Sequence, residues 1–189
     1  HNLAQSAYAL DGYPHVMTSL GPDLMAGVLG WDLKYNDNGE WVVHRDVSME
    51  ELARLSVHKD GFLYRKMEEI LTKFTEDAKQ GDYIIGLVDL NTLLDGIAAL
   101  IGPQNLFFAM QDEPEALLHA MARHLALFKG VYTHFDSIAR RYQGGSTNWL
   151  SVYSDTPWYF ISLDVIVMIS DRAFLQFVEQ PLRDMCAFL

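Results

Sequence analysis

The sequence predicts an α/β fold built on a parallel sheet, and three observations lead to this prediction. Three short apolar segments, 14–18, 83–88 and 159–163, are separated by longer stretches in which apolar residues recur at helical spacing. The segment 83–88 is apolar on both alternating faces, as expected for a strand that is covered on both sides. Parallel strands also require crossover connections, and these are almost always right-handed helices.

The first strand–helix unit spans residues 14–30, in which a β-prone segment is followed by Gly-Pro-Asp and by a helical run that Gly30 would close. Two segments, 33–35 and 40–44, then flank the sequence Asn-Asp-Asn-Gly at 36–39. Because these four residues tolerate the positive φ of a tight turn, we expect a small antiparallel hairpin.

Two helices are expected after the hairpin. Ser48 and Glu51 form a capping-box pattern before a short helix, and apolar residues recur every three or four positions between 63 and 74. The second strand–helix unit follows, with its strand at 83–88 and its helix at 92–101. The glycine and proline that come next end this helix, because proline disfavours helical geometry in the residue before it.

A long helix is predicted from Glu115 to about Tyr142, where a Gly-Gly-Ser sequence stops its pattern. After an aromatic-rich loop, the apolar run 159–163 is interpreted as the third strand, which ends at Asp164. Ser170 then caps a final helix. The whole alternation describes about three strand–helix units and a small N-terminal hairpin.

An open sheet of three parallel strands would leave unpaired backbone groups at its edges, and closure into a barrel would remove them. A (β/α)8 TIM-type barrel needs about 250 residues, so a chain of 189 residues would supply about three of its eight units. Residues 185–189 also form an apolar helical stretch without a cap. We therefore expect residues 1–189 to be a single domain, the N-terminal to central portion of an incomplete barrel.

Composition and charge exclude several classes of protein. The formal net charge of -11 disfavours nucleic acid and anionic membranes as partners, because phosphate binding relies on clustered Lys and Arg. Cys186 is the one cysteine, so the chain can form neither an intrachain disulfide nor a thiolate-rich metal cage. Residues 1–10 show no export signal, and the longest apolar stretch, 158–169, is shorter than a membrane span of roughly 20 residues. We expect a cytoplasmic protein.

Several segments resemble one family of barrel enzymes. After the apolar run that ends in Asp164, the residues that carry the resemblance are Met168, Ile169, Ser170, Phe174, Phe177, Val178, Pro181 and Leu182. This part resembles the strand, loop and helix around an acidic residue in the uroporphyrinogen decarboxylase and corrinoid methyltransferase superfamily. Residues 83–101 resemble the next upstream strand and helix, and 112–115 resemble the turn before a long family helix. Residues 144–149 are similar to a glycine-rich loop in decarboxylase-like proteins of unassigned activity.

The resemblance implies a (β/α)8 barrel whose pocket lies at the carboxyl ends of the strands, with Asp89 and Asp164 as its catalytic residues. It implies a lyase that decarboxylates a tetrapyrrole, or a methyltransferase that uses a corrinoid protein or a small methylated compound. The family's methyltransferases bind zinc on later strands, so the resemblance places any zinc ligands beyond Leu189 and no metal site in this chain. No activity is expected from this piece alone.

The chain departs from the decarboxylases at three places. Their arginine-rich N-terminal segment, which binds substrate carboxylates, has no recognisable counterpart here. Their tyrosine in the helix after the upstream strand corresponds to residues 96–98, and their serine after the strand-end acid corresponds to Val165. These differences leave open a second function, a noncatalytic small-molecule-binding or protein-interaction protein whose strand edges are completed by a homodimer or by another chain.

The candidate site residues are two acids and four possible substrate contacts. Asp164 interrupts an apolar run, and a carboxylate is costly to bury unless it is paired or functional. Its alternative role is to hydrogen-bond the loop that follows. Asp89 is the second catalytic candidate, and Asn91 is a candidate substrate contact, although both residue types often cap helices.

The other candidate substrate contacts are His15, Trp149 and Trp158. His15 could reach the pocket from the first strand, or it could be a hydrogen-bonded structural histidine. The two tryptophans suit stacking on a planar substrate, but core packing or a dimer surface would also explain them. His119 and His124 are five residues apart on a helix and therefore diverge around it, so we interpret both as structural.

Overall fold

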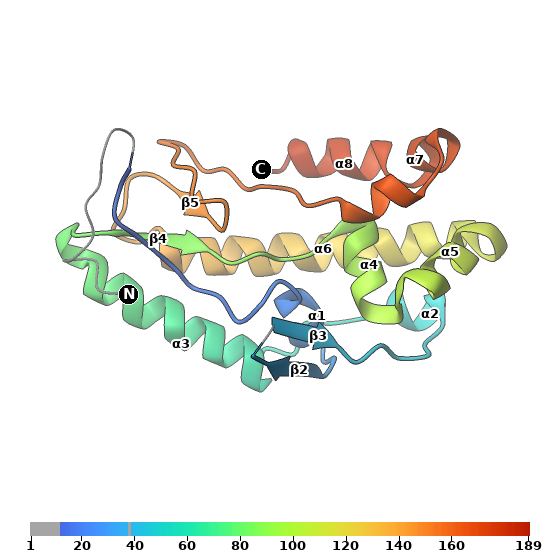
Figure 1. Ribbon diagram of the computed structural model, residues 1–189, viewed down its shortest axis with the longest axis horizontal. Coiled ribbons are helices and arrows are strands. Elements are labelled where there is room, and N and C mark those ends of the chain that lie inside the picture. The colour runs from blue at the N-terminus through green and yellow to red at the C-terminus, as the bar shows by residue number, and fades with distance from the viewer. Residues whose placement is uncertain (1–11, 38) are drawn as a thin grey trace.

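The computed structural model describes residues 12–37 and 39–189, and it has the predicted α/β alternation (Figure 1). In chain order the elements are β1 (His15–Met17), α1 (Leu24–Val28), β2 (Leu33–Asn36), β3 (Gly39–Val42), α2 (Met49–Leu52), α3 (Phe62–Asp77), η2 (Ala78–Gln80), β4 (Ile84–Leu87), α4 (Leu93–Ile101), α5 (Pro103–Asp112), α6 (Pro114–Ala139), β5 (Thr147–Asn148), η3 (Asp164–Met168), α7 (Asp171–Phe177) and α8 (Glu179–Cys186). The expectation of no export signal in residues 1–10 concerns residues outside this description.

The main sheet has three parallel strands in the order β1–β4–β5, with β4 in the middle. His15 pairs with Ile84 on one side of β4, and Leu87 pairs with Asn148 on the other. The predicted hairpin is also present, as the antiparallel pair β2–β3. Within the described residues the parallel strands form an open sheet, and no complete barrel is seen.

The third strand lies elsewhere than the sequence predicts. The apolar run 159–163 forms no strand, and β5 comes from residues 147–148, directly after the Gly-Gly-Ser sequence. The run approaches β4 through a side chain instead, because the hydroxyl of Tyr159 bonds to the backbone of Val88 and Leu90. Apolar composition indicates burial, but it cannot distinguish a strand from an irregular buried segment.

Helix α6 is the central helix of the helical layer. Its predicted span, 115–142, is close to the observed one. It contacts α2, α3, α4, α5, α8 and β4, and it runs along the length of the molecule in Figure 1. Phe128 and Phe135 on this helix are fully buried, which is worth about 2–3 kcal/mol each from removal of apolar surface. Helices α3 and α6 both contact β4, and α6 lies behind it in Figure 1.

Local signals located most helix ends correctly, but the single helix predicted after Ser170 is observed as two, α7 and α8. The Ser48–Glu51 capping box is formed, and the Ser170 hydroxyl accepts a hydrogen bond from the backbone N–H of Ala173. The prediction missed α5, in which Pro103 both ends α4 and opens the next helix, since proline fits the first helical turn. Among the described residues no single helix is long and apolar enough to cross a membrane, although α4 and α5, which meet at 112°, would together reach that length.

Candidate carboxylate site

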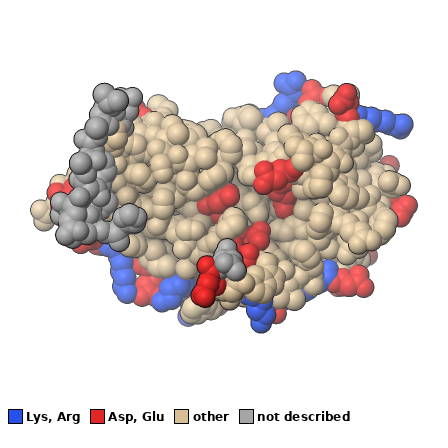
Figure 2. Space-filling model, in the orientation of Figure 1, with Lys and Arg blue, Asp and Glu red and all other residues tan. Residues whose placement is uncertain are grey.

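The carboxyl edge of the parallel sheet collects most of the predicted site residues. Because Leu87 at the end of β4 pairs with Asn148 at the end of β5, the residues that follow both strands leave the sheet at the same edge. Asp89 lies two residues beyond β4, and Trp149 directly follows β5. Figure 2 shows acidic side chains near the middle of the face that is viewed, with most lysines and arginines at its rim.

Asp89 is the most perturbed carboxyl group of this edge. Partial burial is the main cause that raises its pKa to about 6. The negative charges of Asp23, Asp164 and Asp95 also raise the pKa, and a hydrogen bond from the backbone of Leu90 lowers it. A carboxyl group with this pKa exchanges its proton near neutral pH, which suits proton transfer.

Tyr159 holds the backbone on both sides of Asp89. Its hydroxyl donates to the carbonyl oxygen of Val88 at 2.9 Å and accepts from the backbone N–H of Leu90 at 2.6 Å. The side chain is buried, and desolvation followed by the nearby charge of Asp89 raises the pKa of the phenol well above the ordinary value. Tyr159 therefore remains a neutral donor and acceptor, and it restrains the residue between its two partners.

Asp164 is brought to the same edge by a second aspartate. The carboxylate of Asp95 on α4 accepts from the backbone N–H of Asp164 at 2.6 Å and from that of Val165 at 2.9 Å. Burial raises the pKa of Asp95, and these two hydrogen bonds lower it. The side chain of Asp164 is exposed, so the structure gives it access to solvent rather than the buried position predicted from its apolar neighbours.

Asn91 connects the carboxyl edge of the sheet to Asp23, the residue that precedes α1. Its amide nitrogen donates to Asp23 at 2.7 Å, and the backbone N–H of Asp23 donates to Glu40 at 2.6 Å. Burial raises the pKa of both carboxyl groups. Gly21, with φ +101°, makes the approach of Glu40 possible, because a Cβ at this position would lie 1.9 Å from the Glu40 carboxyl carbon.

Both candidate tryptophans are partly buried, and each has a buried indole nitrogen without a hydrogen-bond partner. Trp149 packs edge-on against Phe160, with 5.0 Å between ring centroids. The amide nitrogen of Asn148 and the hydroxyl of Thr92 at the start of α4 are also buried and unpartnered. Such atoms are rare in folded proteins. Asn148 ends β5, Trp149 directly follows it, and Thr92 is the N-cap of α4.

His15 lies away from these residues. It is the first residue of β1 and pairs with Ile84, five residues before Asp89, so the two lie roughly 16 Å apart along the sheet. Its ring nitrogens contact the Ser151 hydroxyl at 2.9 Å and the Tyr13 carbonyl at 3.2 Å. The structure therefore connects Asp89 with Asp164 directly and with Asn91 through Asp23. Trp149 leaves the sheet at the same edge, and His15 lies at the opposite end of the strands from Asp89.

Sequence reasoning missed the roles of Asp95 and Tyr159. Asp95 stands in an otherwise apolar helix, so the desolvation argument applied to Asp164 would also have found it. No sequence signal identifies Tyr159, because its partners, Val88 and Leu90, are about 70 positions away. Such long-range contacts depend on the tertiary fold.

His124, which the sequence predicts to be structural, is buried in an unusual environment. Both ring nitrogens are buried without a hydrogen-bond partner, and desolvation lowers the pKa to about 4. The ring packs against Gly96 of α4, where a Cβ would lie 2.4 Å from the His124 Cε1 atom. Gly96 thus makes room for a neutral imidazole.

The described residues contain no group of three or more His, Cys, Asp or Glu side chains arranged to hold a metal ion. We also compared the chain with protein-family models, curated proteins and solved structures, and none of them matches it. The family resemblance inferred from the sequence therefore stays a prediction.

Proposed function

We propose that the carboxyl edge of the β1–β4–β5 sheet is the substrate-binding edge of a uroporphyrinogen decarboxylase-like enzyme, and that these strands belong to a (β/α)8 barrel. The parallel strand order and the helices that follow β1 and β4 support the barrel. The observation that carries the proposal is Asp89, which follows the central strand and has a pKa of about 6. Active sites of such barrels lie at this end of the strands.

The charges around Asp89 favour methyl transfer over decarboxylation. All the charged groups that perturb Asp89 are carboxylates, Asp23, Asp164 and Asp95. Like charges disfavour the binding of a polycarboxylate substrate, whereas they attract a cationic or N–H-bearing ligand. We infer that the substrate is a neutral or cationic small methylated compound, with a corrinoid protein as the methyl acceptor. A tetrapyrrole whose N–H groups donate to these carboxylates is the second candidate.

Asp89 would act as a general acid in either reaction. In methyl transfer the bond between the methyl carbon and its heteroatom breaks, the methyl group passes to the nucleophile of the acceptor, and Asp89 protonates the departing heteroatom. In decarboxylation the bond to the carboxylate carbon breaks, CO2 leaves, and the Asp89 proton forms the new C–H bond. Water then restores the proton to Asp89. Tyr159 keeps the backbone around Asp89 in place during either step.

The family's methyltransferases use zinc to keep an acceptor thiol ionised, but the described residues do not fit such a site. Zinc would therefore need ligands from outside these residues. The proposed setting is cytoplasmic, in line with a chain that has a single cysteine.

The test is an activity comparison in the full-length protein. Methyl transfer from methanol, a neutral donor whose departing oxygen must be protonated, to reduced cobalamin is followed by absorbance, and uroporphyrinogen decarboxylation is followed by chromatography of the products. We expect the methyl transfer rate to fall by about 100- to 10,000-fold in Asp89→Asn, because general acid catalysis contributes an effect of this size. The control is Asp82→Asn, which changes an exposed aspartate before the other end of β4 and should leave the rate unchanged.

The outcomes separate the candidate functions. A full methyl transfer rate in Asp89→Asn would remove Asp89 from the mechanism. Turnover of uroporphyrinogen without turnover of the methyl donor would replace methyl transfer by decarboxylation. Binding of either compound without turnover would favour the noncatalytic function.

A further inference from the structure

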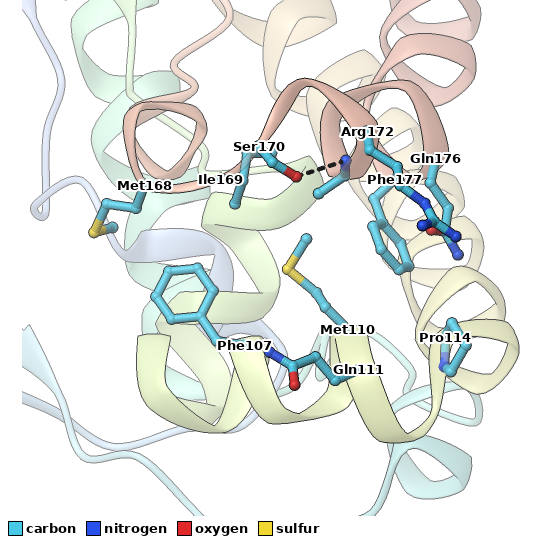
Figure 3. Close-up of a pocket in the computed structure, with 11 residues that line it drawn as sticks. Phe107, Met110, Gln111, Pro114, Met168, Ile169, Ser170, Arg172, Gln176 and Phe177 are labelled. Carbon is cyan, nitrogen blue, oxygen red and sulfur yellow. Dashed lines mark hydrogen bonds between the residues drawn. The ribbon is translucent and has the colours of Figure 1, made fainter.

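A second cavity lies apart from the carboxylate edge, between α5 and the segment formed by η3 and α7. Its volume is about 510 Å³, within the range of pockets that hold drug-sized molecules. Helix α5 supplies Phe107 and Met110, while Ile169 and Phe177 come from the opposite side. Figure 3 shows the Met110 side chain extending from α5 toward Ser170 across this space.

The cavity is lined by both apolar and polar side chains, and one of them is cationic. Arg172 on α7 lines it together with Gln176, one turn farther along the helix, and the two side chains lie next to each other at one end of the cavity (Figure 3). The nearest acid in sequence, Asp171, adjoins Arg172 on the helix, and adjacent helical residues do not face each other.

Arg172 differs from the other arginines of the described chain. Each of the others forms an ion pair, a hydrogen bond to a carbonyl oxygen or a contact with an aromatic ring. Arg172 alone among them has no such partner. In a protein with a net charge of -11, an exposed guanidinium without a protein partner at a partly apolar cavity is available to an anionic ligand. Guanidinium groups bind carboxylates through two parallel hydrogen bonds.

We propose that this cavity binds an amphipathic monoanion, such as a medium-chain or aryl carboxylate. The apolar part lies against Phe107, Met110 and Phe177, and the carboxylate bonds to Arg172. The adjacent Gln176 amide supplies a further donor. This inference does not rest on the proposed function of the carboxylate edge, because it uses different residues and is tested by binding alone.

The affinity test is calorimetric titration with decanoate below its micelle concentration. One molecule should bind per chain, and Arg172→Gln should weaken binding by about 10- to 100-fold, since a hydrogen bond to a charged group is worth about 1.5–3 kcal/mol. Methyl decanoate, which keeps the chain but lacks the charge, should bind the wild type as weakly as decanoate binds the variant. The control Lys34→Gln removes an exposed positive charge on β2 and should leave the affinity unchanged.

The location test uses the methionine methyl groups as reporters in NMR spectra. Met110 and Met168 both line the cavity, so their methyl resonances should shift on addition of decanoate, whereas that of Met67, buried on α3, should not. Equal affinity in wild type and Arg172→Gln, or unshifted Met110 and Met168 resonances, would overturn the proposal. Concentration-dependent dimerisation that shifts the same two methyl groups without ligand would also overturn it, because a second copy of the chain would then fill the cavity.

Discussion

Asp89 at the carboxyl edge and His124, which packs between α4 and α6, both have pKa values shifted from the ordinary ones. The surroundings that cause the two shifts differ. Desolvation, together with the charges of three carboxylates, raises the pKa of Asp89 to about 6. Desolvation alone lowers the pKa of His124 to about 4, and its ring nitrogens have no partner. A shifted pKa therefore does not by itself mark a site. What distinguishes the edge is the convergence of several polar groups where a ligand has access.

As the pH falls, protonation of His124 should lower the stability of the fold, and protonation of Asp89 should raise it. The folded-state pKa of His124 lies below the ordinary value of 6.5, so the unfolded chain takes up this proton first and stability falls as the pH drops from 6.5 toward 4. The folded-state pKa of Asp89 lies above the ordinary value of 3.8, so its ionisation destabilises the fold above pH 6. That effect disappears as the pH falls from 6 toward 3.8.

The largest predicted effect concerns His124. The free energy of unfolding of the wild type should fall by about 3 kcal/mol relative to His124→Leu between pH 7.5 and pH 4, because the variant has no imidazole to protonate. Urea denaturation at each pH measures this difference. The exposed His119 lies on the same helix, and His119→Leu should change the difference by less than about 0.5 kcal/mol. Parallel pH curves for wild type and His124→Leu would contradict burial of a neutral imidazole.

The second prediction concerns the Tyr159 hydroxyl. Tyr159→Phe should lower the free energy of unfolding by about 2 kcal/mol, because two buried backbone groups, at Val88 and Leu90, lose their partner. Urea denaturation at pH 7.5 tests this. The matched control is Tyr142→Phe, whose hydroxyl bonds to an exposed glutamate and whose loss should change stability by less than about 0.5 kcal/mol. Equal losses in the two variants would show that Tyr159 does not restrain the edge.

The smallest predicted effect has the opposite sign. Asp89→Asn should raise the free energy of unfolding at pH 7.5 by about 1 kcal/mol, a figure reduced for the partial solvent exposure of the group. The gain should vanish by pH 4, where the native carboxyl is neutral. Thermal or urea unfolding of wild type, Asp89→Asn and the control Asp82→Asn at both pH values provides the measurement. A loss of stability at pH 7.5 would mean that the Asp89 carboxylate makes a stabilising contact.

Patterns confined to a few neighbouring residues were predicted well. The Ser48–Glu51 capping box, the hairpin, the strand β4 and the long helix α6 follow from local chemistry and periodicity, and all are present. The position of Asp89 and Asn91 just after β4 was also predictable, because the residue types that end a strand are visible in the sequence. The third strand was placed wrongly, since apolar composition is shared by strands and irregular buried segments.

The sequence by itself determined the α/β alternation, the helix caps and the acids that follow the central strand, because these depend on interactions between residues close in the chain. Only the tertiary structure decided which of those acids act together. It paired the backbone of Asp164 with Asp95, placed Tyr159 over the segment around Asp89, and left His15 at the other end of the sheet. These contacts join residues about 70 positions apart or depend on strand register, and no local pattern encodes either of them.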